Sequence, residues 1–163
     1  MKKLSLISLF ILFSINTFAK DNSIPKVLDD WKDWVLADHQ RELCPYGQNN
    51  TSAYICYWPS KLNLKLNERG GTFKGTWSVF KEGSIVLPGG KEQWPANVKV
   101  NGSLKPIGDS TGVPTVRLPK GVHRISGTFK WKHLPLRLRL PNGVGTISFA
   151  LNGKDVKYPK INN

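Results

Sequence analysis

The sequence is poor in cysteine, methionine and acidic residues, and after residue 19 it has no long hydrophobic run. A membrane-spanning helix needs about 18 consecutive apolar residues, so no span is expected beyond that point. The two cysteines form no CxxC motif, and His39, His123 and His133 lack metal-ligand spacing, so we expect neither a metal nor a cofactor. Eleven acidic residues against 24 basic ones leave a formal net charge of +13. A charged ligand, if there is one, is therefore expected to be an anion.

Residues 1–19 have the pattern of a secretory signal peptide. Two lysines precede an apolar run, and Thr17 and Ala19 are small residues at the −3 and −1 positions before Lys20. An uncleaved membrane anchor is the alternative. We expect an exported chain whose mature part begins at Lys20.

Export to an oxidising compartment determines the expected state of the two cysteines. An even number of cysteines in an oxidising compartment predicts a disulfide, here between Cys44 and Cys56. Gly47, Asn49 and Asn50 lie between them and favour a tight loop. Two buried free thiols are the alternative.

Residues 20–44 predict one amphipathic helix. Ser23 can cap it, Asp29 and Asp30 lie near its positive end, and Pro45 would end it. Apolar side chains recur at a spacing of three and four residues, at Val27, Leu28, Trp31, Trp34 and Val35. We expect this stripe to pack on the following domain, with an aromatic ligand platform as the alternative.

Residues 45–163 predict a mainly β domain, an antiparallel β-sandwich-like fold of about eight or nine short strands. Residues 61–67 alternate strictly between apolar and polar, and residues 73–79 repeat the pattern after a turn expected at Gly70-Gly71. Asn-Gly pairs at 101–102 and 152–153 predict hairpin turns. Further strands are expected at residues 98–100, 113–118, 122–132, 134–140 and 149–151.

The positive charge is concentrated in the β region. Residues 20–44 carry four basic and six acidic residues, whereas residues 45–163 carry eighteen basic and five acidic ones. The polar faces of the expected strands at 122–132 and 134–140 are basic, so a pairing of these strands would bring like charges together. The candidate anion-binding residues are Arg124, Lys130, Lys132, Arg137 and Arg139. A solvated face that discourages edge aggregation is the alternative.

Two of the six tryptophans are candidates for stacking on a sugar ring. Trp58 and Trp94 each precede a proline, a context that suggests a loop. Core packing or loop anchoring is the alternative for each, because most aromatic rings are buried.

The sequence does not predict an enzyme. A glycosidase needs two facing carboxylates, but the carboxylates of the β region lie mostly in turns or charged segments. They are Glu68, Glu82, Glu92, Asp109 and Asp155. An unrecognised hydrolase is the alternative, because catalytic residues meet in space and not in sequence. Export and the lack of a recognised motif argue against nucleic acid as a partner.

Several segments together resemble the extracytoplasmic N-terminal region of large, uncharacterised envelope membrane proteins of gammaproteobacteria. The segments are Ile24-Pro25-Lys26-Val27-Leu28 with Asp30-Trp31-Lys32, Cys56-Tyr57-Trp58-Pro59, Trp94-Pro95 with Val98-Lys99-Val100-Asn101-Gly102, and the run from Leu118 to Trp131 with Leu134-Pro135. The resemblance covers essentially the whole mature chain. It implies a β-rich envelope domain, periplasmic or envelope-associated, in a Gram-negative bacterium, and it supplies no site residues. The chain would then be a truncated, split or free-standing relative of those proteins.

These observations lead to two functional hypotheses. The first is a non-catalytic exported module that binds an envelope polysaccharide, lipopolysaccharide or anionic lipid headgroups through the basic strand face. The second is a structural domain that packs on another envelope protein, or a remnant of a larger membrane protein.

Overall fold

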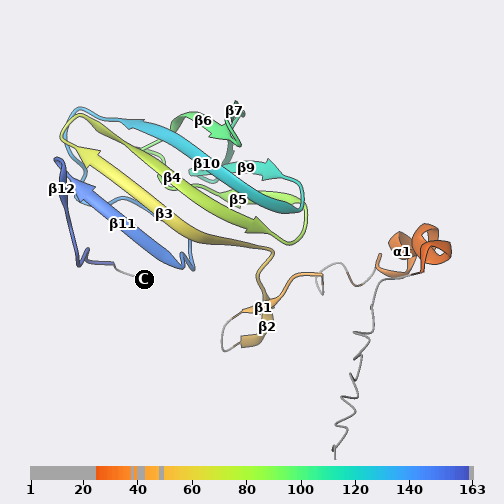
Figure 1. Cartoon of the computed structure of the whole chain (residues 1–163). Helices are drawn as coiled ribbons and strands as arrows, with labels where there is room; N and C mark the ends of the chain where they lie inside the picture. The colour runs from red at the N-terminus through yellow and green to blue at the C-terminus, as the bar shows by residue number, and fades with distance from the viewer. Residues whose placement is uncertain (1–24, 38, 40–42, 48–49, 162–163) are drawn as a thin grey trace, which may run out of the picture. The chain divides into compact units, whose positions relative to one another are not determined.

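The computed structural model describes residues 25–37, 39, 43–47 and 50–161 (Figure 1). The chain forms two compact units, Met1–Ala37 and Asp38–Asn163. The expected signal peptide lies outside the described residues. Within the described ranges, no helix is long and apolar enough to cross a membrane.

The first unit contains the 3-10 turn η1 (Lys26–Leu28) and the helix α1 (Asp29–Val35). Asp29 and Asp30 occupy the first turn of α1, as expected. The helix ends at Val35, so the prediction that it continues to Cys44 and Pro45 is wrong. The positions three and four residues after Val35 are Asp38 and His39, so the apolar stripe does not continue, and a short helix needs an apolar face to pack in order to persist.

The apolar stripe of α1 is exposed within its own unit. Trp31 and Trp34 are 62% and 74% exposed, and their rings meet edge to face with centroids 6.1 Å apart. The packing of this stripe on the β domain stays a prediction.

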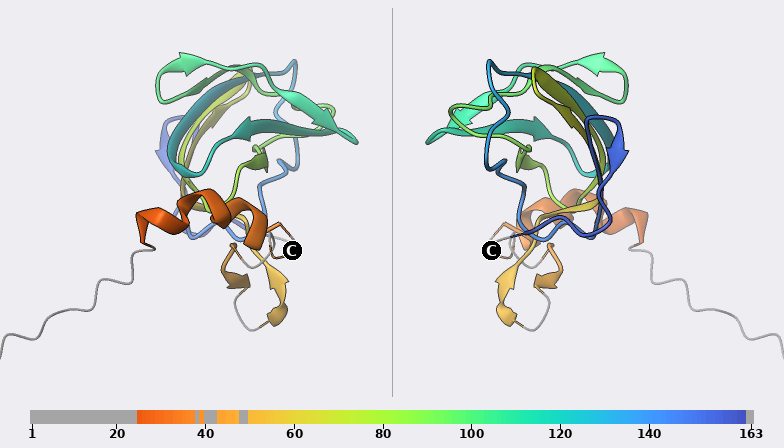
Figure 2. Two further views of the ribbon diagram at one scale, coloured as in Figure 1. Left: turned by 90° about the vertical axis from the view of Figure 1, so that its right-hand side faces the viewer. Right: turned by 90° about the vertical axis from the view of Figure 1, so that its left-hand side faces the viewer.

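The second unit is mainly β, which confirms the expected fold class. A seven-stranded sheet has the order β12-β11-β3-β4-β10-β6-β7, a three-stranded sheet has the order β5-β9-β8, and β1 pairs with β2. The turned views of Figure 2 show the large sheet as one curved layer, with β5 and β9 on its concave side. The strands are β1 (Tyr46–Gly47), β2 (Asn50–Tyr54), β3 (Tyr57–Asn67), β4 (Gly70–Val79), β5 (Gly83–Val86), β6 (Ala96–Val100), β7 (Ser103–Leu104), β8 (Gly108–Ser110), β9 (Val113–Leu118), β10 (Gly121–Lys130), β11 (Thr146–Leu151) and β12 (Lys154–Asp155).

Alternating side chains decide which face of the large sheet is buried. Leu62, Leu64 and Leu66 of β3 point inward and are at most 8% exposed, whereas Lys61 and Lys65 on the opposite face are exposed. Strands β4 and β10 repeat this alternation, as the sequence predicted. The inward side chains form one core between the two sheets, centred on Phe73, Trp77, Ile85, Leu87, Ile125 and Phe129.

Glycines make room for the two largest rings of this core. The ring of Trp77 lies so close to Gly75 that a Cβ added there would be 2.4 Å from Cζ3. Gly127 lies opposite Phe73 across the β4–β10 pair, and a Cβ there would be 2.5 Å from Cε1 of that ring. Both glycines are therefore packing sites for aromatic rings.

Both Asn-Gly turns form as predicted. Asn101 and Asn152 have φ values of 50°, followed by glycines at 90° and 77°, as hairpin turns of this kind require. The turn between β3 and β4 is at residues 68–69 and not at Gly70-Gly71, because both glycines belong to β4 and pair with the end of β10.

The predicted strand at residues 134–140 is absent. Strand β10 has β4 on one edge and β6 on the other, so neither edge is open to this segment. Pro135 and Pro141 also remove backbone donors that a ladder would need. Only two of its four leucines, Leu138 and Leu140, pack against the core, while Leu136 is fully exposed.

Residues 131–145 instead connect β10 to β11 across the side of the domain opposite the large sheet (Figure 2). This long connection lets β11 run parallel to β3, with Thr146 opposite Lys61 and Leu151 opposite Leu66. The sheet is therefore mixed and not purely antiparallel, because a crossover of this length can join parallel strands and a tight turn cannot.

The predicted disulfide is present. Cys44 and Cys56 are joined with an S–S distance of 2.04 Å, and Cys44 is buried. The bridge closes the base of the β1–β2 hairpin, where the Ile55 amide also donates to the Pro45 carbonyl (2.8 Å).

Candidate anion-binding face

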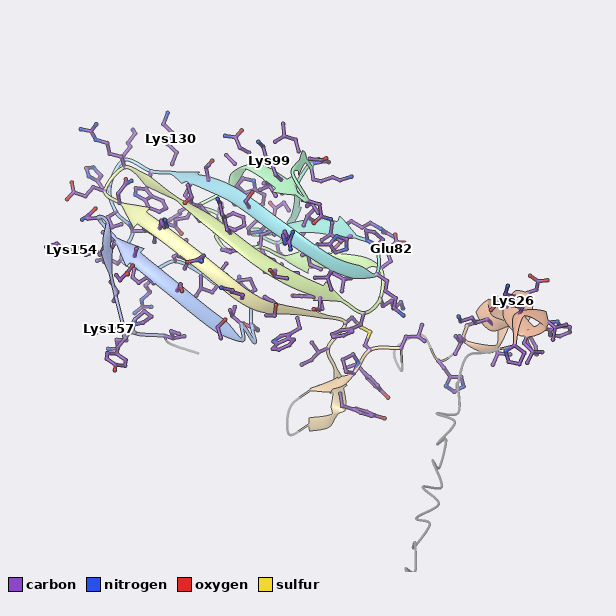
Figure 3. The ribbon with its side chains drawn as sticks, viewed as in Figure 1. Lys26, Glu82, Lys99, Lys130, Lys154 and Lys157 are labelled. Carbon is purple, nitrogen blue, oxygen red and sulfur yellow. A yellow bond between two sulfur atoms is a disulfide. The ribbon has the colours of Figure 1, made fainter. Side chains whose placement is uncertain are left out.

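The outer face of the large sheet is the most concentrated basic surface of the described strands. We define the outer face as the side chains of β11, β3, β4, β10 and β6 that point away from the core. Its cations are Lys61, Lys65, Lys74, Lys99, Arg124 and Lys130, all exposed. Figure 3 shows Lys99 and Lys130 extending from the sheet into solvent. Among the outer positions of these five strands, which the structure describes throughout, there is no carboxylate.

The strand register separates these cations by neutral polar side chains. Lys61 and Arg124 face each other across Thr76, and Lys74 and Lys99 face each other across Ser126. Strands in a sheet are about 4.8 Å apart, so the backbones of each pair lie roughly 10 Å apart. The nearest carboxylate in the described part of this sheet is Asp155 of β12, opposite Ala150 at the sheet edge.

Lys74 is the central charge of the face. It lies directly opposite Asn63 on β3, so Lys61 and Lys65 are its diagonal neighbours on that strand. Arg124 is its diagonal neighbour on β10. Diagonal neighbours on a sheet are about 7–8 Å apart, within reach of long side chains. Three like charges therefore surround Lys74.

A shallow depression of about 290 Å³ lies at this point of the outer face. Lys61, Lys74 and Arg124 supply three cationic groups to its lining. Asn63, Thr76 and Ser126 add an amide and two hydroxyls. The depression thus combines positive charge with hydrogen-bonding groups, the chemistry that holds a carboxylate or a phosphate.

The Asn101-Gly102 turn forms one wall of the depression and is fixed to β10. Asn101 exchanges two hydrogen bonds with Arg124: its amide donates to the Arg124 carbonyl (2.8 Å), and its Oδ1 accepts from the Arg124 amide (2.8 Å). The buried His123 beside it donates from Nε2 to the Pro119 carbonyl (2.9 Å), and its Nδ1 lies 3.4 Å from Asn101 Nδ2. These contacts fix the backbone that carries the Arg124 guanidinium.

The structure brings together only part of the predicted cationic set. Arg124 and Lys130 lie on the outer face, and Lys132 is exposed just after β10 ends. Arg137 and Arg139 are exposed on the 131–145 connection, where the Arg139 carbonyl accepts from the Gly89 amide (2.8 Å). The prediction that they form one face with β10 is wrong, because their segment lies on the other side of the domain.

Trp58 shares the outer face, although the sequence suggested a loop. It belongs to β3 and lies opposite Ser78, one row from the Lys61–Thr76 pair. Its ring is 44% exposed, and its Nε1 donates to the Gly143 carbonyl (2.9 Å). Trp94 is half-buried in the connection between β5 and β6, outside the strands of the sheet.

Four cations of the outer face were missed by the sequence analysis, namely Lys61, Lys65, Lys74 and Lys99. The strict alternation of residues 61–67 already places Lys61 and Lys65 on a polar face. The sequence does not show that β4 lies between β3 and β10, nor which residues of the three strands are aligned. That register brings Lys61 and Lys74 to the same depression as Arg124.

Two acidic groups of the domain, Glu82 and Asp109, have structural contacts. Glu82 Oε1 accepts from Arg117 Nε (3.0 Å), with both side chains exposed, and Asp109 Oδ1 accepts from the Gly112 amide (2.6 Å). Over the residues that the structure describes, no group of three His, Cys, Asp or Glu side chains could hold a metal ion. The fold and the outer face together define a mainly β domain with a cationic sheet surface.

Comparison with known proteins does not extend this description. No protein family and no curated protein matches the sequence. A crystal structure of an M1 zinc metallopeptidase from Deinococcus radiodurans aligns over 47% of this chain and 20% of its own length, with 13% identity and a TM-score of 0.36. Its E323A mutant aligns over 60% and 32%, with 11% identity and a TM-score of 0.40. The chain spans a third or less of these proteins, and similarity this weak carries no information about activity.

Proposed function

We propose that the chain is a non-catalytic, exported module that holds a polyanionic component of the cell envelope on the outer face of its large sheet. The observation that carries the proposal is the set of six cations on β3, β4, β6 and β10, without a carboxylate at any outer position of the five central strands. The signal-peptide pattern and the disulfide are consistent with export.

The arrangement has an electrostatic cost that a polyanion would remove. Like charges at diagonal positions of a sheet repel, and this repulsion lowers the stability of the free domain. A polymer with regularly spaced negative groups would contact several cations at once and release the small ions bound to both partners. The binding should therefore be strong at low salt and weaken steeply as salt rises.

The test is sedimentation of the purified protein with isolated sacculi, lipopolysaccharide and anionic lipid vesicles across a salt series. The decisive variant is the pair of charge reversals Lys74→Glu and Arg124→Glu. The pair Arg137→Glu and Arg139→Glu is the matched control, since it changes the net charge equally on another side of the domain. We expect the first pair to lower the affinity for one fraction about tenfold or more, and the second pair to leave it within about twofold.

Equal losses in both pairs would show that net charge, and not the outer face, governs binding. Absence of binding to every fraction at low salt would overturn the proposal.

A second candidate function rests on the exposed tryptophans of α1. An exposed apolar stripe with Trp31 and Trp34 is the kind of surface that docks on another protein. Capture of one envelope protein that tolerates high salt and is lost on Trp31→Ser with Trp34→Ser would favour this function. The same double variant should still bind polyanions as strongly as the wild type does.

A further inference from the structure

We infer that the outer face carries a site for a negatively charged sugar, with the sugar ring stacked on Trp58 and its acidic group in the depression between Lys61, Lys74 and Arg124. The inference rests on the proposed function and specifies its ligand. The shared chemistry is a pyranose that bears a carboxylate or a phosphate.

The ring and the depression are neighbours on the same face. Trp58 lies opposite Ser78, and the next outer residue of β4 is Thr76, which lines the depression between Lys61 and Arg124. Two residues along a strand span about 7 Å, so one sugar and its acidic substituent reach from the indole to the cations.

The indole is held in place while much of it stays in contact with solvent. Its N–H is satisfied by the Gly143 carbonyl at 2.9 Å, and its edge rests against Gly145, where a Cβ would lie 3.0 Å from Cζ2. The ring is still 44% exposed. A large apolar ring that is fixed but uncovered is pre-organised for a ligand, because binding does not have to order it. Its flat apolar surface matches the C–H face of a pyranose.

The polar lining of the depression favours a saccharide over a lipid bilayer as the ligand. Asn63, Thr76 and Ser126 line the depression beside the cations and can bond the hydroxyls of a sugar. A bilayer-binding surface needs several apolar side chains that insert together. On β3, β4 and β10, the outer positions other than Trp58 hold Lys, Arg, Asn, Ser, Thr and glycine, and one valine, Val122.

The experiment separates the sugar from the charge by titrating four probes against the full chain. An oligosaccharide of galacturonic acid carries ring and carboxylate, a galactose oligosaccharide of equal length carries the ring alone, and inorganic polyphosphate carries charge alone. Phosphorylated galactose oligosaccharide tests phosphate as the acidic group. Titration calorimetry measures each affinity, and indole fluorescence reports contact with a tryptophan.

We expect Trp58→Ala to lower the affinity for an acidic oligosaccharide about tenfold while leaving polyphosphate binding within about twofold. Arg124→Gln should weaken both, and the galactose oligosaccharide should bind far more weakly than the acidic one. Trp58→Phe, which keeps a ring, should recover part of the affinity. The preferred acidic oligosaccharide then shows whether the group is a carboxylate or a phosphate.

Each of the following outcomes would contradict a different part of the inference. If Trp58→Ala and Trp58→Phe leave the affinity for both acidic oligosaccharides unchanged, or weaken polyphosphate equally, the stacking is refuted and the proposed function stands. If galactose oligosaccharide binds equally well, the acidic group plays no part. If only anionic lipid vesicles bind, the ligand is a membrane surface and not a sugar. If no acidic oligosaccharide binds at low salt, the inferred sugar site is refuted, and the proposed function falls with it only if sacculi, lipopolysaccharide and anionic vesicles also fail to bind.

Discussion

Replacement of Lys74 by glutamine should stabilise the domain, because the cations of the outer face repel one another. Lys74 has three cationic diagonal neighbours, Lys61, Lys65 and Arg124. A like-charge pair between exposed side chains costs a few tenths of a kcal/mol, so the three together cost about 1 kcal/mol at low salt. For a domain of this size, that gain corresponds to a rise in the unfolding temperature of about 3–5 °C.

The assay is urea unfolding of wild type and Lys74→Gln at about 0.05 M and 1 M salt. The Debye length falls to about 3 Å at 1 M, so the gain in the free energy of unfolding should nearly vanish there. Lys154→Gln is the control, because Lys154 is exposed on β12 opposite the inward-facing Leu151 and lies off the outer face. Its stability should change by less than about 0.5 kcal/mol. A destabilised Lys74→Gln, or a gain that survives 1 M salt, would refute the reasoning.

Three further perturbations test the fold. The Cys44→Ser and Cys56→Ser pair should lower the free energy of unfolding in urea by about 3 kcal/mol, the chain-entropy value for a separation of 12 residues, and an unchanged midpoint would contradict this. Gly127→Ala should cost about 1–3 kcal/mol by thermal unfolding because its Cβ meets a core ring at 2.5 Å, whereas Gly83→Ala, with its nearest contact at 3.9 Å, should cost far less. Burial raises the pKa of Tyr57 above its usual 10.0, so the unfolded state loses this proton first and stability should fall above about pH 10. Tyr57→Phe should lessen that fall, and identical alkaline slopes would count against it.

The strands were predictable because one side of the sheet is buried. When alternate residues of a strand face a core, apolar and polar residues must alternate, and residues 61–67 and 122–130 do so. The Asn-Gly turns were predictable for a similar local reason, since few residues accept a positive φ.

The alternation of residues 134–140 led to a wrong strand prediction, because an alternating pattern does not show whether a neighbouring strand has a free edge to pair with. In the structure both edges of β10 are taken by β4 and β6. The leucines of the segment therefore face different surroundings, with Leu138 against the core and Leu136 in solvent. Pro135 was the local signal against a paired strand.

Only part of the candidate site could be predicted, because the sequence does not show which strands are neighbours in the sheet. Arg124 and Trp58 were identified from their own segments. Lys61 and Lys74 were not, because their part in the site depends on the register of three strands. An electrostatically unfavourable cluster that the fold retains at one point is typical of a binding surface, where stability is given up for function.

The central claim is that the outer face, and not the net charge, binds a polyanion. The most direct measurement is the shift of backbone amide NMR signals during titration of the isotopically labelled protein with galacturonic acid oligosaccharide at low salt. The account predicts that the largest shifts cluster at Trp58, Lys61, Lys74 and Arg124, and that they disappear as salt is raised. Shifts that spread evenly over all basic segments, or that centre on Arg137 and Arg139, would contradict it.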